Sequence, residues 1–312
     1  MKKLSIIIVN WNTEKEVTNC LLSIEKFAHL DETDVYVVDN NSADNSVEVI
    51  LEKFDWVILT KNNDNLGFGK ANNQILRKVK TEFVFILNPD TSIEKNTLSI
   101  LESFIVSHIE VGLCGPQLLN PDRTIQDVGY YQKFPSLLQV IFFYTQLSLW
   151  SYKKEWLKKW LLLKKNYIDG YFEVDQIPGA CMFGRIKTLK KIGFFDESFP
   201  LWFEDVDLCY RLRKIGVILA MVPESQIMHI GGSSFEKWKD SEAKQIRLFT
   251  SLIHFFDMHF GLLSQVTLRC IIWLDLSLLL IRKIIGQLVS YNKERGRFIE
   301  EKWHVLKALL VL

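Results

Sequence analysis

Cysteine is scarce in the sequence and is never closely spaced. The five cysteines, Cys20, Cys114, Cys181, Cys209 and Cys270, include no C-x-x-C pair and are odd in number. A structural zinc site or a disulfide framework needs closer spacing, so this distribution argues against both. We therefore interpret the thiols as reduced packing residues and expect a cytoplasmic protein.

Net charge is also nearly absent. The 312 residues include 38 Lys and Arg against 37 Asp and Glu, which gives a formal charge of +1. No pervasive basic field is present to meet phosphate groups, so we expect no nucleic-acid partner. Hydrophobic residues make up 48% and charged residues 24%, the balance of a globular chain. The length allows one large domain, or one domain with an appendage.

Glycine is missing where a dinucleotide-binding fold needs it. The apolar run Leu4–Val9 is expected to be a buried strand, and the turn after it reads Asn10-Trp11-Asn12-Thr13. A pyrophosphate at this turn requires glycines, so that the backbone can approach it. The glycines of Leu66-Gly67-Phe68-Gly69 lie far beyond the first strand, and the third glycine of the dinucleotide-binding pattern is missing. The sequence therefore argues against a hydride-transfer enzyme.

The apolar runs are too short for a leader or a membrane span. Lys2-Lys3 precede Leu4–Val9, but that run is brief and polar residues follow where a leader has small ones. The apolar stretch 262–289 is interrupted by charged residues, and a bilayer span needs about 20 apolar residues in a row. We expect monotopic attachment or oligomerisation of this stretch. Its charges are Arg269, Asp275, Arg282 and Lys283.

Strands and helices alternate through the first third of the chain. Expected strands at Leu4–Val9, Val35–Val38, Trp56–Leu59 and Phe83–Leu87 are separated by helical patterns, the first opening with a capping-box sequence at 13–16. This alternation predicts a parallel α/β sheet. Later strands are expected at Val111–Gly115, Ala180–Phe183 and Ile218–Val222, with a helix at Val206–Ile215.

Two acidic residues follow expected strands of this sheet. Asp39 and Asp90 come at strand ends, at the edge where open α/β sheets bind ligands. Asp39 there could accept a pyrimidine imide hydrogen or bind ribose hydroxyls. Asp90, exposed after Pro89, suits Mg²⁺ or Mn²⁺ beside a diphosphate. Each residue could instead be an ordinary turn former.

Three acids crowd into four positions further along the chain. Glu204, Asp205 and Asp207 follow the aromatic pair Trp202-Phe203. Neighbouring carboxylates repel, so the cluster calls for a metal, a base or a capping role. Capping of the following helix explains one of these acids but not three. Beyond them, His229 precedes Gly-Gly-Ser-Ser, which suits a loop over phosphates; the alternative is a structural histidine.

Seven motifs follow one another along the chain: Ser5-Ile6-Ile7-Ile8-Val9-Asn10-Trp11-Asn12, Val38-Asp39-Asn40-Asn41-Ser42, Asn65-Leu66-Gly67-Phe68-Gly69-Lys70-Ala71-Asn72-Asn73, Asn88-Pro89-Asp90, Gly179-Ala180-Cys181-Met182, Gly193-Phe194-Phe195-Asp196-Glu197 and Glu204-Asp205-Val206-Asp207-Leu208-Cys209. Together they closely resemble glycosyltransferase family 2, and most of all its bacterial rhamnosyltransferase-like branch. The resemblance covers about residues 3–235.

The resemblance implies an α/β protein with the GT-A fold, a mainly parallel Rossmann-like sheet flanked by helices. It implies inverting, metal-assisted transfer from a nucleoside-diphosphate sugar. Asp205 matches the base that deprotonates the acceptor, with Glu204 beside it. Asp90 matches the last acid of an Asp-x-Asp motif, and His229 completes the metal end that holds Mg²⁺ or Mn²⁺. Asn88 replaces the first acid of that motif, which removes one anionic ligand.

The same resemblance assigns the donor and acceptor pockets. The donor-binding residues it implies are Asn10, Asn12, Asp39, Asn41, Asn65, Gly67, Asn72 and Asn88. The acceptor-binding residues it implies are Gly179, Ala180, Asp196 and Trp202. The implied donor is dTDP-rhamnose, and a UDP-hexose or UDP-galactofuranose is the alternative. The implied acceptor is a cell-surface or polyprenyl-diphosphate-linked glycan. A catalytically silent, membrane-bound subunit is a third reading, against which the retained acids argue.

Two segments fall outside the expected sheet. We expect residues 1–260 to form the GT-A domain, with 134–165 as an amphipathic insertion, and 261–312 to form an amphipathic helical tail. If 149–165 is one helix, Leu149, Trp156, Trp160 and Leu163 share a face opposite Lys154, Lys158 and Lys165, as at a membrane interface. The tail would bind a membrane or pair two copies as a homodimer. We expect a peripheral enzyme on the inner face of the bacterial plasma membrane.

Overall fold

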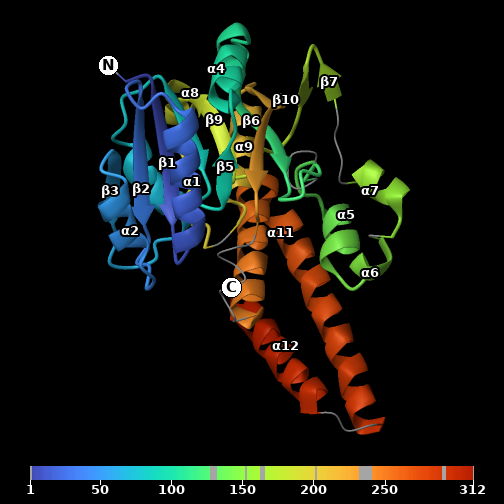
Figure 1. The fold of residues 1–312 in the computed structure, drawn as a ribbon. Coiled ribbons are helices and arrows are strands. Elements are labelled where there is room, and N and C mark those ends of the chain that lie inside the picture. The colour runs from blue at the N-terminus through green and yellow to red at the C-terminus, as the bar shows by residue number, and fades with distance from the viewer. Residues whose placement is uncertain are drawn as a thin grey trace. The chain divides into compact units, whose positions relative to one another are not determined.

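The computed structural model describes residues 2–126, 132–151, 153–161, 166–200, 202–231, 241–289 and 293–311. The chain divides into two compact units. The first unit comprises residues 1–134, 164–197 and 204–238, and the second comprises 135–163, 198–203 and 239–312. The first unit contains the sheet, and the second is helical (Figure 1).

A ten-stranded mixed sheet forms the first unit, in the order β3-β2-β1-β4-β9-β6-β10-β8-β7, with β5 added beside β10. β1 pairs in parallel with β2 and with β4, and β2 pairs in parallel with β3, where the α/β alternation was expected. β9 inserts antiparallel between β4 and β6. The strands are β1 (Leu4–Asn10), β2 (Thr33–Asp39), β3 (Val57–Lys61), β4 (Phe83–Leu87), β5 (Thr91–Ile93), β6 (Val111–Leu119), β7 (Asn166–Ile168), β8 (Tyr171–Glu173), β9 (Cys181–Arg185) and β10 (Ile218–His229).

The parallel part of the sheet consists of β3, β2, β1 and β4, and β6 also runs parallel to β10. β9 runs antiparallel to both of its neighbours, and the short strands β5, β7 and β8 also pair antiparallel. β4 is buried along its whole length and β1 along nearly all of it, as expected for continuous apolar runs covered on both faces. The α/β prediction is confirmed.

β10 is longer than the sequence suggested. Its expected end at Val222 is wrong: a register shift between Val222 and Gln226 bulges the strand, which then continues to His229. The last residues of β10 pair with β5, and His229 lies opposite Thr91. The bulge therefore carries a histidine from the far end of the chain to the residue next to Asp90.

Helices of the first unit fill the connections. They are α1 (Glu14–Phe27), α2 (Ser46–Lys53), α3 (Phe68–Leu76), α4 (Thr97–Ser107), α8 (Ile186–Lys191) and α9 (Glu204–Lys214). The capping box expected at 13–16 does not form. The Thr13 hydroxyl donates to Asn10 Oδ1 at 2.6 Å, and Asp44 Oδ2 accepts from the Glu14 N–H at 3.0 Å. A partner 30 residues away thus replaces the local cap.

The second unit consists of helices, which are α5 (Leu137–Gln139), the π-helix η1 (Val140–Tyr144), α6 (Ser148–Ser151), α7 (Glu155–Leu161), α11 (Ser241–Val289) and α12 (Lys293–Val311). The single helix expected over 149–165 is wrong, because α6 ends at Ser151 and α7 begins at Glu155. Leu163 and Lys165 lie outside the described residues. α11 bends at Gly261, whose φ of 78° is left-handed, so the expected tail boundary falls inside this helix.

α11 and α12 pack against each other as an antiparallel pair (Figure 1). Within the described residues, no helix is both long enough and apolar enough to cross a bilayer. The proposed division at 260/261 stays a prediction, since the compact second unit takes up α11 from its start.

Candidate active site

The ends of β1 and β2 hold a buried polar cluster around Asp39. Asn10 Nδ2 donates to Asp39 Oδ1 at 2.8 Å, and the Ser42 hydroxyl donates to the same oxygen at 2.6 Å. The Ser42 N–H donates to Asp39 Oδ2 at 3.0 Å. Asn10 and Asp39 are paired across the two strands, so the parallel register fixes their contact. Asp39 lies at the predicted rim and is 2% exposed.

Two asparagines shape the turns beside this cluster. Asn12 and Asn41 both have left-handed backbones, with φ of 54° and 64°. Asparagine tolerates this conformation better than most side chains do. Asn12 Oδ1 also accepts from the Ala43 N–H at 2.7 Å, which joins the two turns. These residues hold the shape of the rim, and their contact with a donor stays a prediction.

The loop before α3 is fixed in the same way. Asn65 Oδ1 accepts from the Gly67 N–H at 2.9 Å, and the carbonyl of Gly67 accepts from Asn40 Nδ2 at 3.2 Å. Gly67 has a φ of 80°, and a Cβ added there would meet nothing within 4 Å. Glycine is therefore favoured here by the left-handed backbone and not by a lack of space. Asn40 follows Asp39 directly, and this bond brings the loop to the rim formed by β2.

Asn72, which the resemblance assigns to donor binding, lies in the helix after that loop and not in the loop itself. Asn72 lies within α3, is fully buried, and donates from Nδ2 to the Phe68 carbonyl at 3.0 Å. Its Oδ1 has no hydrogen-bond partner among the described residues. α3 begins at Phe68, so Asn72 lies one turn into this helix.

Asp90 and His229 lie together at the next part of the rim. His229 Nε2 is 3.4 Å from Asp90 Oδ1, and both side chains are largely buried. The expected exposure of Asp90 after Pro89 is therefore wrong, because β5 and the end of β10 cover this position. His229 Nδ1 is 2.7 Å from Gln126 Oε1, an acceptor that fixes the proton on Nδ1. Nε2 then presents a lone pair toward a carboxylate, and it has no hydrogen bond within the described residues.

This pair fits a divalent cation. Two facing acceptors in a buried place repel each other unless a positive charge lies between them. A carboxylate oxygen and a neutral imidazole nitrogen are ligands that Mn²⁺ and Mg²⁺ sites use, completed by waters and substrate phosphates. The carbonyl Oε1 of Gln126 orients the ring, as outer partners do in metal sites. Within the described residues, no cluster of three or more His, Cys, Asp or Glu side chains supplies a fuller ligand set.

Asn88 connects this end of the rim to the start of β9. The Asn88 N–H donates to the Ala180 carbonyl at 2.9 Å, and the Asn88 carbonyl accepts from the Thr91 hydroxyl at 2.7 Å. Ala180 follows Gly179, whose N–H donates to Asp205 Oδ2 at 2.9 Å. A short path of backbone bonds therefore joins the predicted metal end to the predicted base.

Asp205 and Glu204 open α9 in different surroundings. Asp205 accepts from the N–H groups of Gly179 and Val206, each at 2.9 Å. Burial raises the pKa of Asp205 above its ordinary value, and these two donors offset part of the rise. Burial, and then the charge of Asp205, raises the pKa of Glu204 to about 8. Glu204 Oε2 has no partner among the described residues.

Near neutral pH the two acids therefore carry one negative charge between them. Hydrogen bonds to the ionised form favour it, so Asp205 keeps the negative charge and Glu204 keeps a proton near neutral pH. The pair is packed against α3: a Cβ on Gly179 would come within 3.1 Å of the Phe68 ring, and one on Gly69 would meet the Glu204 Cβ at 3.7 Å. Of the two acids, Asp205 is therefore the one that carries the charge needed to accept a proton.

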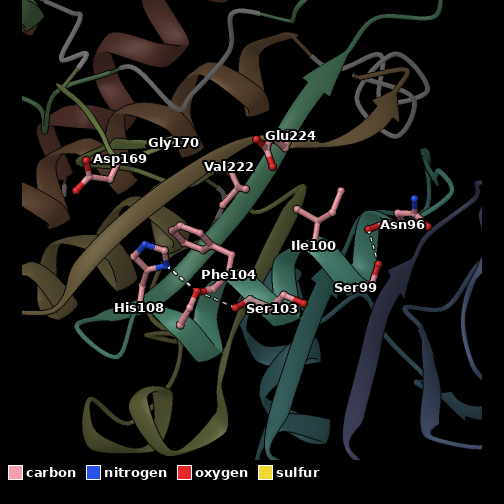
Figure 2. Close-up of a pocket in the computed structure, with 11 residues that line it drawn as sticks. Asn96, Ser99, Ile100, Ser103, Phe104, His108, Asp169, Gly170, Val222 and Glu224 are labelled. Atoms are coloured by element: carbon pink, nitrogen blue, oxygen red, sulfur yellow. Dashed lines mark hydrogen bonds between the residues drawn. The ribbon is translucent and has the colours of Figure 1, made fainter.

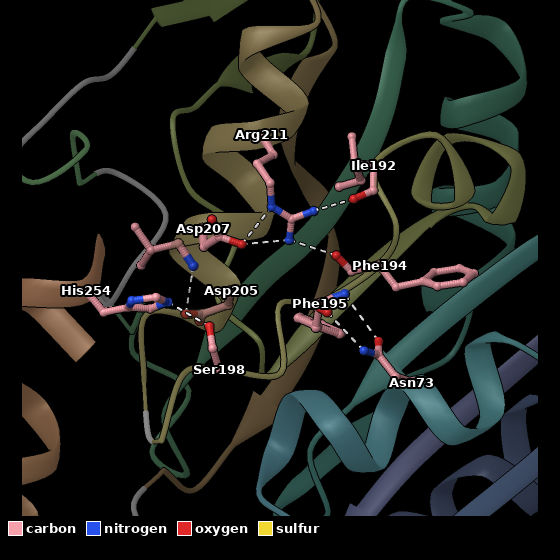
Figure 3. A network of polar contacts seen from close by, with 10 residues as sticks. Asn73, Ile192, Phe194, Phe195, Ser198, Asp205, Asp207, Arg211 and His254 are labelled. Atoms are coloured by element: carbon pink, nitrogen blue, oxygen red, sulfur yellow. Dashed lines mark hydrogen bonds and ion pairs between the residues drawn. The ribbon is translucent and has the colours of Figure 1, made fainter. Parts of the chain in front are cut away.

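The third acid of the cluster has a structural role. Asp207 is fully buried, and Arg211 one turn later binds it, with Nε 2.7 Å from Asp207 Oδ2. The same guanidinium donates to the carbonyls of Ile192 and Phe194 at 2.6 and 2.7 Å. This clamp ties α9 to the left-handed turn at Gly193 and Phe194 (Figure 3). Three acids in four positions thus have three separate explanations.

α3 holds the same turn from the other side. Asn73 Oδ1 accepts from the Phe195 N–H at 3.2 Å, and Asn73 Nδ2 donates to the Phe195 carbonyl at 2.9 Å (Figure 3). Asp196, predicted to bind acceptor, follows directly and is half-buried. Asn73, Arg211, Gln126 and Ser42 are residues that the sequence reading missed. Asn73 and Arg211 lie within or just beyond quoted motifs, but Gln126 has no local pattern.

Trp202 belongs to the second compact unit. It and Phe203 both have left-handed backbones, with φ of 58° and 66°. Bulky residues rarely adopt this conformation, and such strain gathers at functional sites. In the same unit, the Phe203 ring packs against Phe255, with centroids 5.8 Å apart. The predicted acceptor role of Trp202 remains a proposal.

A cavity of about 470 Å³ lies elsewhere in the first unit. Its walls come from α4, the turn at Asp169 and Gly170, and the bulged part of β10 near Glu224 (Figure 2). Its hydroxyls are those of Ser99, Ser103 and Ser107, spaced one helical turn apart. None of the predicted site residues lines it, so the rim and not this cavity is the candidate active site.

The mixed sheet flanked by helices, with Asp39 at the end of β2 and Asp90 just after β4, is the architecture expected of the GT-A fold. The model described as "Glycosyl transferase family 2" matches residues 5–166, slightly more than half of the chain. The chain therefore belongs to glycosyltransferase family 2. The expectations of family, fold and enzyme class are confirmed.

Named relatives are similar at low identity. An N-acetylglucosaminyl-diphospho-decaprenol L-rhamnosyltransferase of Mycobacterium tuberculosis is 23% identical over 206 residues, which cover 62% of this chain. The match spans 66% of that relative, just under two thirds of its length. The rhamnosyltransferase WbbL of Escherichia coli is 26% identical over 172 residues, covering 52% of this chain and 60% of the relative.

A solved structure shares the fold. The mannosyltransferase PcManGT from Pyrobaculum calidifontis, in complex with GDP-Man and Mn²⁺, superposes with a TM-score of 0.56 at 14% identity. The superposition covers 99% of this chain and 86% of that one. At such low identity the likeness establishes the fold alone.

Proposed function

We propose that this enzyme transfers a sugar, with inversion, from a nucleoside diphosphate to a lipid-linked or cell-surface glycan. The observation that carries this proposal is the pairing of Asp205 with Glu204. One acid holds the charge through two backbone N–H donors, and its neighbour holds a proton. An ionised, half-buried carboxylate that accepts two backbone N–H groups is suited to general-base work.

In the proposed reaction, Asp205 accepts the proton of the acceptor hydroxyl as its oxygen bonds to the anomeric carbon of the donor. The bond from that carbon to the diphosphate breaks on the opposite side, which inverts the configuration. Asp90 and His229 would hold a divalent cation, which supplies positive charge to the leaving diphosphate. Asp39 would recognise the pyrimidine, since each carboxylate oxygen has two lone pairs and Oδ2 accepts one hydrogen bond within the described residues.

The specific substrates rest on the named relatives. Two of them are called rhamnosyltransferases, and one name specifies a decaprenyl-diphosphate-linked acceptor. We infer dTDP-rhamnose as donor and a polyprenyl-diphosphate-linked saccharide as acceptor, with a UDP-hexose or UDP-galactofuranose as the alternative donor. Such an acceptor would place the enzyme at the cytoplasmic face of the plasma membrane.

The base assignment is tested by Asp205→Asn and Asp205→Ala. Each removes the charge that accepts the proton, so we expect transfer of radiolabelled sugar to fall by about 10²-fold or more. Donor binding, measured by calorimetry with Mn²⁺, should change little. Asp55→Asn, at an exposed acid between α2 and β3, is the control. Transfer that stays near the wild-type rate in both variants would remove Asp205 from this role.

A donor panel addresses the substrate. Thermal shift of the protein with dTDP-rhamnose, UDP-glucose, UDP-galactose and UDP-galactofuranose, each with Mn²⁺, compares nucleotide and sugar directly. We expect the largest shift with dTDP-rhamnose. A larger shift with a UDP-hexose would favour the alternative donor on the same scaffold, and binding without turnover of any donor would favour a silent subunit.

A further inference from the structure

The second half of α11 has one buried face. Four leucine-like side chains at every fourth position are buried, and α12 packs against this helix with three buried residues of its own. The buried set on α11 is Leu268, Ile272, Leu276 and Leu280, and that on α12 is Val305, Leu306 and Leu309. Positions four apart fall on one side of a helix, so this side of α11 is the one that packs against α12.

The opposite face of α11 is apolar and exposed. Its side chains follow the three- and four-residue spacing of a single helix face. They include Leu263 at 82% exposed, Leu274 at 60%, Ile281 at 53%, Ile285 at 57% and Leu288 at 82%. From residue 263 to 288 the stripe runs about 38 Å at 1.5 Å per residue. We call this set the α11 stripe.

Charged side chains are placed off this stripe. In a helical projection of 263–288, Arg269 and Lys283 project toward the α12 side, and Asp275 and Arg282 lie at the margin. The stripe therefore exposes a continuous uncharged strip over seven turns. A contiguous apolar surface of this length is unusual on a soluble domain and indicates a binding surface.

Tryptophan and lysine side chains add to the exposed surface of the same unit. Trp150, Trp156 and Trp160 on α6 and α7 are 49%, 63% and 59% exposed, while Leu157 between them is buried. Lys154 Nζ lies 5.6 Å from the Trp150 ring centre. Amphipathic rings with lysine amines beside them suit a lipid headgroup region.

These short helices are fastened to α11. The Gln146 N–H donates to Asp275 Oδ1, and Gln146 Nε2 donates to the Asp275 carbonyl, both at 3.0 Å. Asp275 stands at the margin of the α11 stripe. The tryptophan-bearing segment and the stripe are thus parts of one surface-bearing unit, joined by two hydrogen bonds.

Charge is divided unequally between the two compact units. The second unit has 15 Lys and Arg against 8 Asp and Glu, a formal charge of +7. The first unit has 23 against 29, a charge of −6. The near-zero total thus conceals a strongly basic helical unit. Each basic residue that lies close to a bilayer strengthens the attraction of the protein to anionic lipids.

We propose that the α11 stripe, with the exposed tryptophans of α6 and α7, is a docking surface for an anionic lipid bilayer. A second copy of the chain is the other occupant of suitable shape, but two units of charge +7 repel each other. An anionic bilayer instead attracts that charge while its acyl region accepts the apolar side chains. This surface would lie parallel to the membrane plane. The inference does not depend on the proposed reaction.

The test is flotation of the full-length protein with vesicles. The probes are phosphatidylcholine vesicles with about 30% phosphatidylglycerol, and phosphatidylcholine alone. The test variant is the triple change Leu274→Gln, Ile281→Gln and Leu288→Gln. The matched control is Leu51→Gln, Val106→Gln and Ile109→Gln, three comparably exposed apolar side chains of the first unit, at 61%, 57% and 86%.

We expect wild type and control to bind the anionic vesicles and the stripe variant to bind about 100-fold more weakly. Binding should fall in about 0.5 M salt and be weaker to the neutral vesicles. Circular dichroism and transfer activity in detergent show whether the variant is folded. Equal binding by variant and wild type would overturn the proposal. So would wild-type dimers in sedimentation that the stripe variant converts to monomers, without vesicle binding by either protein.

Discussion

At the scale of single residues, the acids of the site differ because their hydrogen-bond donors differ. Asp39 accepts hydrogen bonds from Asn10 and Ser42, and Asp205 accepts them from two backbone N–H groups. Glu204 Oε2 has no hydrogen-bond partner within the described residues. Residue type alone could not separate these roles. What could be predicted was position: strand ends in a parallel sheet lie at one rim, which puts Asp39 and Asp90 at that rim but does not reveal that Asp90 is buried.

The partners of these residues could not be predicted. Gln126 is over 100 positions from His229, and a bulge in β10 brings the two together. No local pattern encodes such a contact, because it depends on the register of β5 against β10. The capping box at Thr13 failed for the same reason, since the cap comes from Asp44.

Glu204→Gln should change how stability depends on pH. The folded state raises the pKa of Glu204 to about 8, so between its ordinary value and about 8 the folded state binds more protons than the unfolded state. This group therefore makes its full contribution to the free energy of unfolding below its ordinary pKa, and that contribution is lost as the pH rises through about 8. In the glutamine variant that loss disappears, a difference on the order of 4–5 kcal/mol at high pH.

The measurement is urea unfolding of wild type and Glu204→Gln from pH 5 to 9. Glu48→Gln, at an exposed acid of α2, is the control and should run parallel to wild type. If the free energy of unfolding of Glu204→Gln kept the wild-type slope with pH, the burial of a protonated Glu204 would be contradicted.

Gln126→Leu should weaken metal binding without touching a metal ligand. The leucine cannot accept the Nδ1 proton of His229, so the ring loses its orientation and its tautomer preference. Loss of such a partner typically lowers metal affinity about 10- to 100-fold. The free Mn²⁺ signal in electron paramagnetic resonance measures this affinity directly. Gln74→Leu, at a half-buried glutamine of α3, is the control; unchanged affinity in Gln126→Leu would argue against His229 as a ligand.

At the scale of elements, the strands were the part of the fold that the sequence predicts best. Buried parallel strands are apolar on both faces, so β1 and β4 appear as continuous runs with sharp ends. The break between α6 and α7 was not visible, because both helices keep amphipathic spacing across it. α9 begins at Glu204 and not at the expected Val206, because Glu204 and Asp205 belong to its first turn.

The clamp between α9 and the Gly193 turn gives a prediction at this scale. Asp207→Asn removes the counter-ion of Arg211 in a place where Asp207 is fully buried. Breaking a buried pair from one side costs about 3–5 kcal/mol, because the remaining charge stays desolvated. Urea unfolding measures the loss. Asp34→Asn, in an exposed pair with Lys2, should cost less than about 1 kcal/mol, and equal costs would contradict the clamp.

At the scale of the whole molecule, the chain combines an acidic unit that contains the sheet with a basic helical unit. The sequence indicated the two kinds of segment, because the α/β alternation stops near residue 98 and amphipathic helices follow. It could not show that residues 135–163, 198–203 and 239–312 form one compact unit. Such grouping depends on contacts far apart in the chain, such as those of Gln146 with Asp275.

Two compact units should respond differently to substrate. Donor nucleotide and Mn²⁺ bind the rim of the first unit under the proposed function, so they should raise its unfolding temperature and leave the second unit unchanged. At about 100 times the dissociation constant, the gain of about 2.7 kcal/mol corresponds to roughly 5–10 °C for a domain of this size. Differential scanning calorimetry with dTDP or UDP plus Mn²⁺ measures both transitions. The transition lowered by Asp207→Asn identifies the first unit, and a nucleotide-dependent shift of the other transition instead would place the donor site outside the rim.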